Sequence, residues 1–270
     1  MKIVTGYWGN YIQQKTERLQ LFRAVISQIS RIYPQSTIDI WYPLRDQGLL
    51  WNNLNDIPNT SYCSLSKEFE EPKVYDQIRY SVAKYYPEGY LWIDPDCLLF
   101  RSLEKLDDFD LYGYRREDYS KLYPNRNDKV IRDYEQEICA EYRHRAGNLG
   151  IYKVPAELGY VISEENKKLV NRYLPEQESI LHCWISQGMP MMIAEKYRKR
   201  IGYLEDYSTE TAWHFCRDNL YISENIAVHR PGDNADESEM WNRVLSHLDE
   251  FDDVHSVKEF KKLIVSNRCE

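Results

Sequence analysis

The chain has 270 residues, of which 43% are hydrophobic and 29% are charged, and its 35 Lys and Arg against 43 Asp and Glu give a formal net charge of -8. This composition provides apolar material for a sizeable core and excludes a chain that is disordered over most of its length. The acidic balance excludes nucleic acid as the main partner, because binding to phosphate backbones needs clustered Lys and Arg.

The sequence shows neither a secretion leader nor a membrane span. Residues 1–9 lack the apolar region and the small-residue cleavage site of a signal peptide. The longest apolar stretches, at 89–93 and 97–100, fall short of the roughly 20 residues that a membrane span needs. We therefore expect a cytoplasmic protein without a transmembrane segment, which leaves room for peripheral membrane contact. The six cysteines have no pair at zinc-site spacing, and we expect most of them to be reduced and buried.

Strand and helix patterns alternate along the first hundred residues. Such alternation is typical of an α/β fold with a largely parallel sheet flanked by helices. The spacing of the apolar residues and the positions of the prolines predict these elements in chain order: a strand at 2–6, a helix at 16–33, a strand at 37–42, a long connection at 44–58 with a short helix, a helix at 72–86 and a strand at 90–93.

The second half of the chain is harder to interpret. Residues 115–141 are polar and rich in both charges, and we expect a loop that leads into a helix. The remaining patterns predict strands at 110–114 and 148–154, helices at 164–173 and 178–188, and a strand end at 226–228. Because the chain has neither a repeat nor a flexible linker, we expect one domain over residues 1–270.

The sequence Asp94-Pro95-Asp96 directly follows the apolar strand predicted at 90–93. Ligands of parallel sheets bind beyond the carboxyl ends of the strands, so both carboxylates are expected at a cleft. Pro95 holds the segment extended, and two anions close together favour a hard divalent cation between them. The motif therefore indicates a site for Mg²⁺ or Mn²⁺ that also takes a diphosphate, whereas the alternative is a simple turn after a strand.

Two further features could belong to the same site. Asp76 and Arg79 are one helical turn apart and can present a carboxylate and a guanidinium together, either to a phosphate or sugar or as a surface ion pair. His229 follows the short apolar run at 226–228 and could be a metal ligand, a phosphate donor or a structural residue.

Together these residues resemble the GT-A class of nucleotide-sugar-dependent glycosyltransferases, and especially the DxD-containing enzymes of glycosyltransferase family 8. The likeness covers about residues 1–235 and follows the order of the family's motifs. These motifs are matched, in chain order, by D-x-x-R at 76–79, the apolar strand with D-x-D at 90–96, N-x-G at 148–150, an acidic-Gln-acidic stretch at 176–178 and a C-terminal His at 229. Two positions depart from the family pattern: Glu stands for the usual Asp in the acidic-Gln-acidic stretch, and the Lys that usually follows the final His is either replaced by Arg230 or missing.

The resemblance implies a GT-A, Rossmann-like sheet with a nucleotide-sugar half at about 1–110 and an acceptor half at about 111–270. It also implies a role for each matched residue. The implied metal ligands are Asp94, Asp96 and His229; the implied donor-binding residues are Thr5, Gly6, Tyr7, Trp8, Asp76, Arg79, Asp94, Asn148 and Gln177; the implied catalytic residues are Glu178 and Arg79. Tyr7 and Trp8 are candidates to stack on the nucleotide base, and core packing is the alternative for both aromatic side chains.

The expected activity is metal-dependent transfer of a hexosyl or pentosyl group from a nucleoside diphosphate sugar, with a UDP-sugar favoured, to a hydroxyl of a glycan or lipid-linked acceptor. One alternative is a carbohydrate- or protein-binding module without catalysis, in which the aromatic surface binds the ligand. A second is a phosphotransferase of the haloacid-dehalogenase type, which also uses D-x-D after a strand. Such enzymes usually place the motif on their first strand and have Thr or Val where this chain has Leu98.

Overall fold

The computed structural model describes residues 2–7, 16–65, 78–95, 97–99, 102–103, 109–113, 115–117, 146–173, 186–203, 213–214 and 227–229. A seven-stranded sheet in the order β10-β6-β9-β4-β1-β2-β3 forms its centre. The strands of this sheet are β1 (Ile3–Gly6), β2 (Ile38–Pro43), β3 (Thr60–Leu65), β4 (Tyr90–Ile93), β6 (Leu111–Gly113), β9 (Ile151–Val154) and β10 (Ile201–Tyr203).

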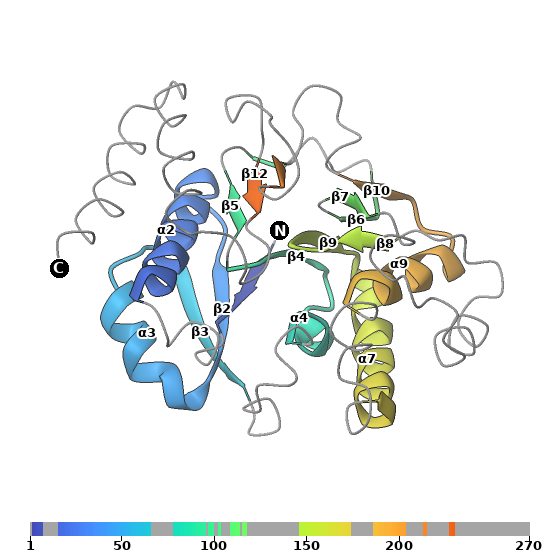
Figure 1. Cartoon of the computed structure of the whole chain (residues 1–270), viewed down its shortest axis with the longest axis horizontal. Helices are drawn as coiled ribbons and strands as arrows, with labels where there is room; N and C mark the ends of the chain where they lie inside the picture. The colour runs from blue at the N-terminus through green and yellow to red at the C-terminus, as the bar shows by residue number, and fades with distance from the viewer. Residues whose placement is uncertain are drawn as a thin grey trace.

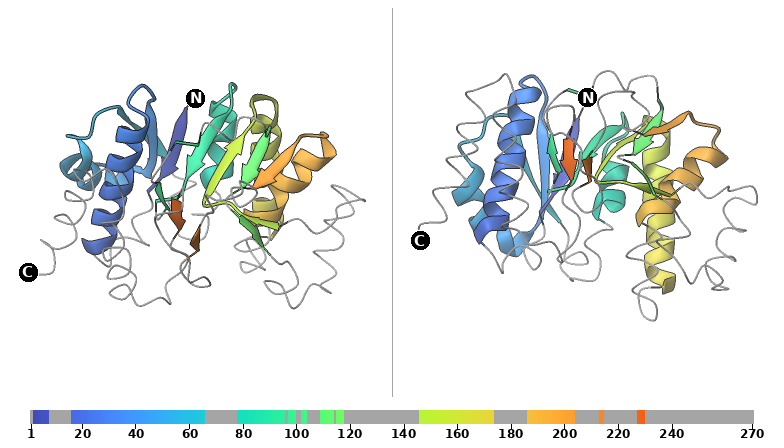
Figure 2. Two further views of the ribbon diagram at one scale, coloured as in Figure 1. Left: turned by 90° about the horizontal axis from the view of Figure 1, so that it is seen from above. Right: turned by 45° about the horizontal axis from the view of Figure 1, so that its top comes forward.

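The sheet is mostly parallel, as the sequence predicts. β3, β2, β1 and β4 run parallel to one another, and so do β10 and β6. Only β9 among these strands runs the other way, because it pairs antiparallel with both β4 and β6. Strands from both halves of the chain therefore share one sheet, and the two views in Figure 2 show its twist.

Helices cover both faces of the sheet (Figure 1). One face is covered by α2 (Thr16–Ile32), whose Phe22 packs on Tyr7 of the segment after β1, with ring centroids 5.4 Å apart. The opposite face is covered by α4 (Ile78–Ser81), the 3-10 helix η4 (Val82–Tyr85), α7 (Gly159–Tyr173) and α9 (Ser186–Lys196). Shorter helices connect the strands: η1 (Leu44–Asp46), α3 (Gln47–Leu54) and η6 (Ala156–Leu158).

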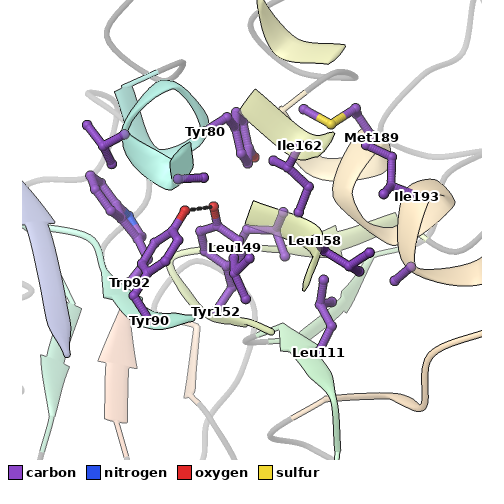
Figure 3. Close-up of a cluster of buried hydrophobic side chains, with 14 of the residues drawn as sticks. Tyr80, Tyr90, Trp92, Leu111, Leu149, Tyr152, Leu158, Ile162, Met189 and Ile193 are labelled. Carbon is purple, nitrogen blue, oxygen red and sulfur yellow. Dashed lines mark hydrogen bonds between the residues drawn. The ribbon is translucent and has the colours of Figure 1, made fainter. Parts of the chain in front are cut away.

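Alternation along β4 explains how the two faces of the sheet differ. Leu91 and Ile93 are on the face toward α2, and Tyr90 and Trp92 are on the face toward α4, because successive strand residues point to opposite sides. All four side chains are buried, as expected for a central strand with helices on both faces. Figure 3 shows the core under α4, where Tyr90 and Trp92 lie beside Tyr152 and below α4.

Two small sheets flank the central one. In the first, β12 (Ala227–His229) lies between β11 (Trp213–His214) and β5 (Cys97–Leu99). In the second, β7 (Arg115–Glu117) pairs with β8 (Ala146–Asn148). β5 begins within a few residues of the end of β4, and so the first small sheet lies next to Asp94 and Pro95.

Several elements of the structure differ from the predicted ones. The sequence analysis misses β3, β5, β10 and β11, which are short or, like β3, at a sheet edge with mostly half-buried side chains. The strand expected at 148–154 is divided into β8 and β9 by Leu149 and Gly150. The loop expected from residue 115 begins with β7, and α9 continues to Lys196 although Pro190 lies inside it. The remainder of the expected helices at 72–86, 115–141 and 178–188 lies outside the part of the chain that the structure describes.

The described residues also bear on the expectations for membrane spans and cysteines. None of their helices is both long and apolar enough to cross a bilayer. Of the six cysteines, the structure places Cys63 half-buried and Cys97 buried, both as free thiols, and the other four lie outside the described ranges.

Candidate functional site

The carboxyl ends of β1, β2 and β4 meet at one edge of the sheet because these three strands are parallel. The register pairs Val4 with Trp92, which places Gly6 level with Asp94 at this edge. In open α/β sheets the crevice beyond such strand ends is where ligands bind. The predicted donor and metal residues that the structure describes gather at or beside this edge.

Asp94 is buried at the end of β4 and is held by three groups. Its Oδ2 pairs with Nη1 of Arg79 at 3.3 Å, and its Oδ1 accepts a hydrogen bond from Nε1 of Trp92 at 2.6 Å. Its backbone N–H donates to the carbonyl of Gly150 at 2.6 Å. The side chains of Arg79 and Asp94 are only 9% and 10% exposed, so the ion pair is shielded from water and from salt.

Arg79 is fixed at both of its ends. Its guanidinium donates to the carbonyl of Leu149 at 3.1 Å and pairs with Asp94. Its own carbonyl accepts hydrogen bonds from the hydroxyls of Tyr90 at 2.6 Å and Tyr152 at 3.1 Å, and the two hydroxyls are 2.8 Å apart (Figure 3). Burial raises the pKa of both phenols, so each keeps its proton and remains a donor.

The N-x-G stretch at 148–150 meets the D-x-D segment through its backbone. The carbonyl of Leu149 accepts a hydrogen bond from the guanidinium of Arg79, and the carbonyl of Gly150 accepts one from the N–H of Asp94. Asn148 is the last residue of β8, and its backbone pairs with that of Arg115 on β7. Three motifs far apart in the sequence are thus joined by hydrogen bonds at one place.

The register of the small sheet brings His229 to the same region. In the antiparallel pair of β12 and β5, the backbone of His229 lies opposite Cys97, the residue directly after Asp96. In the parallel pair of β11 and β12, His214 lies in register with His229. Sequence reasoning did not identify His214, because two residues of strand leave no periodic signal.

Thr5, Gly6 and Tyr7 lie where the prediction expects them, at the carboxyl end of β1. Thr5 and Tyr7 are fully buried, and Tyr7 packs on Phe22, so its ring takes part in the core. The Oγ1 of Thr5 and the hydroxyl of Tyr7 have no hydrogen-bond partner among the described residues. Burial, followed by the nearby Asp46, raises the pKa of Tyr7, which is therefore neutral. Contact of these residues with a nucleotide base stays a prediction.

Five predicted site residues lie outside the described ranges: Trp8, Asp76, Asp96, Gln177 and Glu178. The ion pair expected between Asp76 and Arg79 is accordingly neither found nor excluded, whereas the pair between Arg79 and Asp94 is present. Among the side chains that the structure describes, no group of three or more His, Cys, Asp or Glu residues could hold a metal ion. The backbone of His229 nevertheless lies opposite Cys97, three residues after Asp94, and carboxylate and imidazole are groups that a divalent cation accepts as ligands.

Chemically, the arrangement offers a fixed guanidinium and a fixed carboxylate beside the ends of three parallel strands. A guanidinium suits the oxygens of a phosphate or a sugar, and a carboxylate suits a divalent cation or a hydroxyl. Besides His214, sequence reasoning missed Trp92, Tyr90 and Tyr152. For Tyr90 and Trp92 a signal exists in the period of two that puts them on one face of the strand with Asp94.

Comparison with known proteins gives a structural likeness only. No protein-family model matches the sequence, and no curated protein matches it. A solved structure of the galactosyltransferase LgtC, in complex with donor and acceptor sugar analogues, aligns with a TM-score of 0.53 and 14% identity over 98% of this chain and 96% of that one. The glycosyltransferase GlyE from Streptococcus pneumoniae aligns with a TM-score of 0.52 and 10% identity over 99% of this chain and 63% of that one. These likenesses show a GT-A-like fold.

Proposed function

We propose that this protein is a metal-dependent glycosyltransferase that uses a nucleoside diphosphate sugar, with a UDP-sugar favoured, as its donor. The observation that carries the proposal is the convergence at the end of β4: Arg79, Asp94, the 148–150 turn and the backbone of His229 all reach it. These are motifs by which the sequence resembles family 8 enzymes, and the fold in which they converge is the fold of glycosyltransferases.

The donor would be held by the chain's own charged groups. The guanidinium of Arg79 would bind the diphosphate or the sugar, and Asp94, Asp96 and His229 would hold Mn²⁺ or Mg²⁺ beside it. When bound, such a cation neutralises charge on the departing diphosphate. Thr5, Gly6, Tyr7 and Trp8 would border the nucleotide, and Asp76, Asn148 and Gln177 would contact the sugar.

The acceptor is a hydroxyl of a glycan or of a lipid-linked sugar in this proposal. In an inverting reaction Glu178 would take the acceptor proton, whereas a retaining reaction needs no base opposite the donor. The expected position of Glu178 at the start of a helix in the acceptor half is what supports this choice.

A calorimetric screen with UDP-, GDP- and TDP-sugars, each with Mn²⁺, Mg²⁺ or chelator, tests the donor class. We expect one nucleotide to bind and the affinity to fall when the metal is removed. Binding of free glycans with no response to any nucleotide would favour the binding module instead. Turnover of a generic phosphate ester without nucleotide-sugar binding would favour the phosphotransferase.

A further inference from the structure

Trp92 is a buried aromatic residue whose single polar atom is directed at the site. It is 0% exposed in the core under α4, where an apolar side chain of similar size would fill the same space. A buried indole N–H needs an acceptor, and here the acceptor is the carboxylate of Asp94, at 2.6 Å. A hydrogen bond to a charged acceptor is stronger than one between neutral groups.

The two oxygens of Asp94 are thereby given different partners. Oδ1 receives the indole N–H of Trp92, and Oδ2 lies 3.3 Å from the guanidinium of Arg79. A carboxylate held by two donors from different directions cannot rotate freely about its terminal bond. Trp92 is on the central strand β4, so the donor that fixes Oδ1 comes from one of the most rigid parts of the fold.

Two further aromatic residues hold the backbone of Arg79, the other partner in the ion pair. Tyr90 lies two residues before Trp92, on the same face of β4, and with Tyr152 of β9 it donates to the carbonyl of Arg79. The carboxylate of the ion pair is therefore held by Trp92, while the two phenols hold the backbone of Arg79 from which the guanidinium extends. Of these contacts, the bond from Trp92 is the one that reaches a charged functional group directly.

We propose that Trp92 is a positioning residue, which orients the carboxylate of Asp94 toward Arg79 and the bound donor. This inference rests on the proposed function, because it assigns Asp94 to the donor and metal site. Loss of the indole N–H is therefore expected to reduce the gain in nucleotide affinity that metal provides, in a protein that still folds.

The test compares Trp92→Phe with Trp41→Phe. Trp41 also donates its indole N–H to a side-chain oxygen, the hydroxyl of Tyr86 at 2.7 Å, but this contact does not involve Asp94 or Arg79. Each variant thus loses one indole hydrogen bond and keeps an aromatic ring. Calorimetry gives the dissociation constants of UDP, GDP and TDP with Mn²⁺ and with chelator. For each nucleotide, the readout is the constant with chelator divided by the constant with Mn²⁺, which measures how much the metal strengthens binding.

We expect Trp92→Phe to reduce this ratio by about tenfold, the usual cost of losing a hydrogen bond to a charged group, and Trp41→Phe to leave it unchanged. If Trp92→Phe does not fold, 3-benzothienylalanine at position 92 replaces the N–H by sulfur and retains the ring shape. Equal ratios in the wild type and in the Trp92 variants would overturn the inference while leaving the proposed function intact. If the wild type binds none of the three nucleotides, the proposed function fails and the inference fails with it.

Discussion

At the scale of single residues, burial changes what Asp94 and Arg79 contribute. An exposed ion pair adds little to stability, but removal of one partner of a buried pair leaves an uncompensated charge. Arg79 would be left in that state without Asp94, since both side chains are about nine-tenths buried. We therefore expect Asp94 to stabilise the fold in addition to its proposed role in the site, which the sequence motif alone does not reveal.

The two carboxylates of the D-x-D segment should respond differently to substitution. We expect Asp94→Ala to lower the free energy of unfolding by about 3 kcal/mol, because it strands the guanidinium of Arg79. Asp96→Ala should abolish metal-dependent turnover while changing the melting temperature little. Denaturant unfolding and circular dichroism of both variants check this. A large loss of stability in Asp96→Ala, or none in Asp94→Ala, would contradict the assignment.

Arg79→Ala is expected to weaken donor binding or turnover by at least about tenfold, or roughly 1.4 kcal/mol, through loss of a charge-assisted contact. It also leaves the buried carboxylate of Asp94 without its partner and removes the hydrogen bond to the carbonyl of Leu149. Because that loss could act through the fold, Leu149→Ala serves as a control that disturbs the same turn without removing a charge. Donor affinity and turnover that match the wild type in Arg79→Ala would mean that Arg79 is purely structural.

At the scale of elements, one glycine fixes the turn that leads into β4. Gly89 has a φ of +78°, and a Cβ at this position would lie 2.6 Å from the carbonyl oxygen of Val154. A side chain therefore meets both backbone strain and a neighbouring strand. The turn sets where β4 starts beside β9, and so it also sets the level at which β4 ends at Asp94.

We expect Gly89→Ala to reduce the free energy of unfolding by about 1–3 kcal/mol. Gly48→Ala, in the exposed part of α3 with no atom within 4 Å of the new Cβ, is the matched control and should be neutral or slightly stabilising. Urea unfolding of both variants measures the effect. Equal stabilities of the two variants would show that the turn before β4 tolerates a side chain.

Asp110 and Arg200 form an ion pair directly before the parallel strands β6 and β10, and its contribution to the stability of the fold should depend on pH. Asp110 accepts a hydrogen bond from the backbone N–H of Arg200 at 2.9 Å, and this bond, with those from the Arg200 guanidinium, lowers the pKa of Asp110 from its usual range. A carboxylate with a lowered pKa stabilises the fold above its unfolded-state pKa, and this contribution is lost as the pH falls through the folded-state pKa.

Asp110→Asn should therefore destabilise the protein at neutral pH and matter less in acid. We expect the difference in unfolding free energy between wild type and variant to shrink between about pH 6 and about pH 3. Urea titrations at the two pH values give this difference. A difference that is constant, or that grows in acid, would contradict the lowered pKa.

Sequence patterns predict the elements that have a strong period or a clear boundary. The strand at 90–93 and the helix from residue 16 are confirmed almost to the residue, since one is a continuous apolar run and the other has regular apolar spacing before Pro34. β3 is missed because an edge strand need not be apolar, and β5 and β11 are missed because two or three residues carry no period.

At the scale of the whole molecule, the fold explains why separate motifs can form one site. The order β3-β2-β1-β4 puts the ends of β1 and β4 side by side, and β9 returns antiparallel so that the 148–150 turn meets the end of β4. The sequence predicts that Asp94 and Arg79 belong to the site. It cannot predict that they pair with each other, because that contact depends on the packing of α4 against β4 and not on spacing along the chain.

Release of the nucleoside diphosphate is the most direct measurement of metal-dependent use of a nucleotide sugar. The purified protein is incubated with UDP-, GDP- and TDP-sugars and Mn²⁺, with and without excess chelator, and the released diphosphate is measured against the Asp96→Ala variant. We expect slow release from one donor class, and we expect this release to stop with chelator and in Asp96→Ala. Release that continues at the full rate in chelator, or no release from any donor, would contradict it.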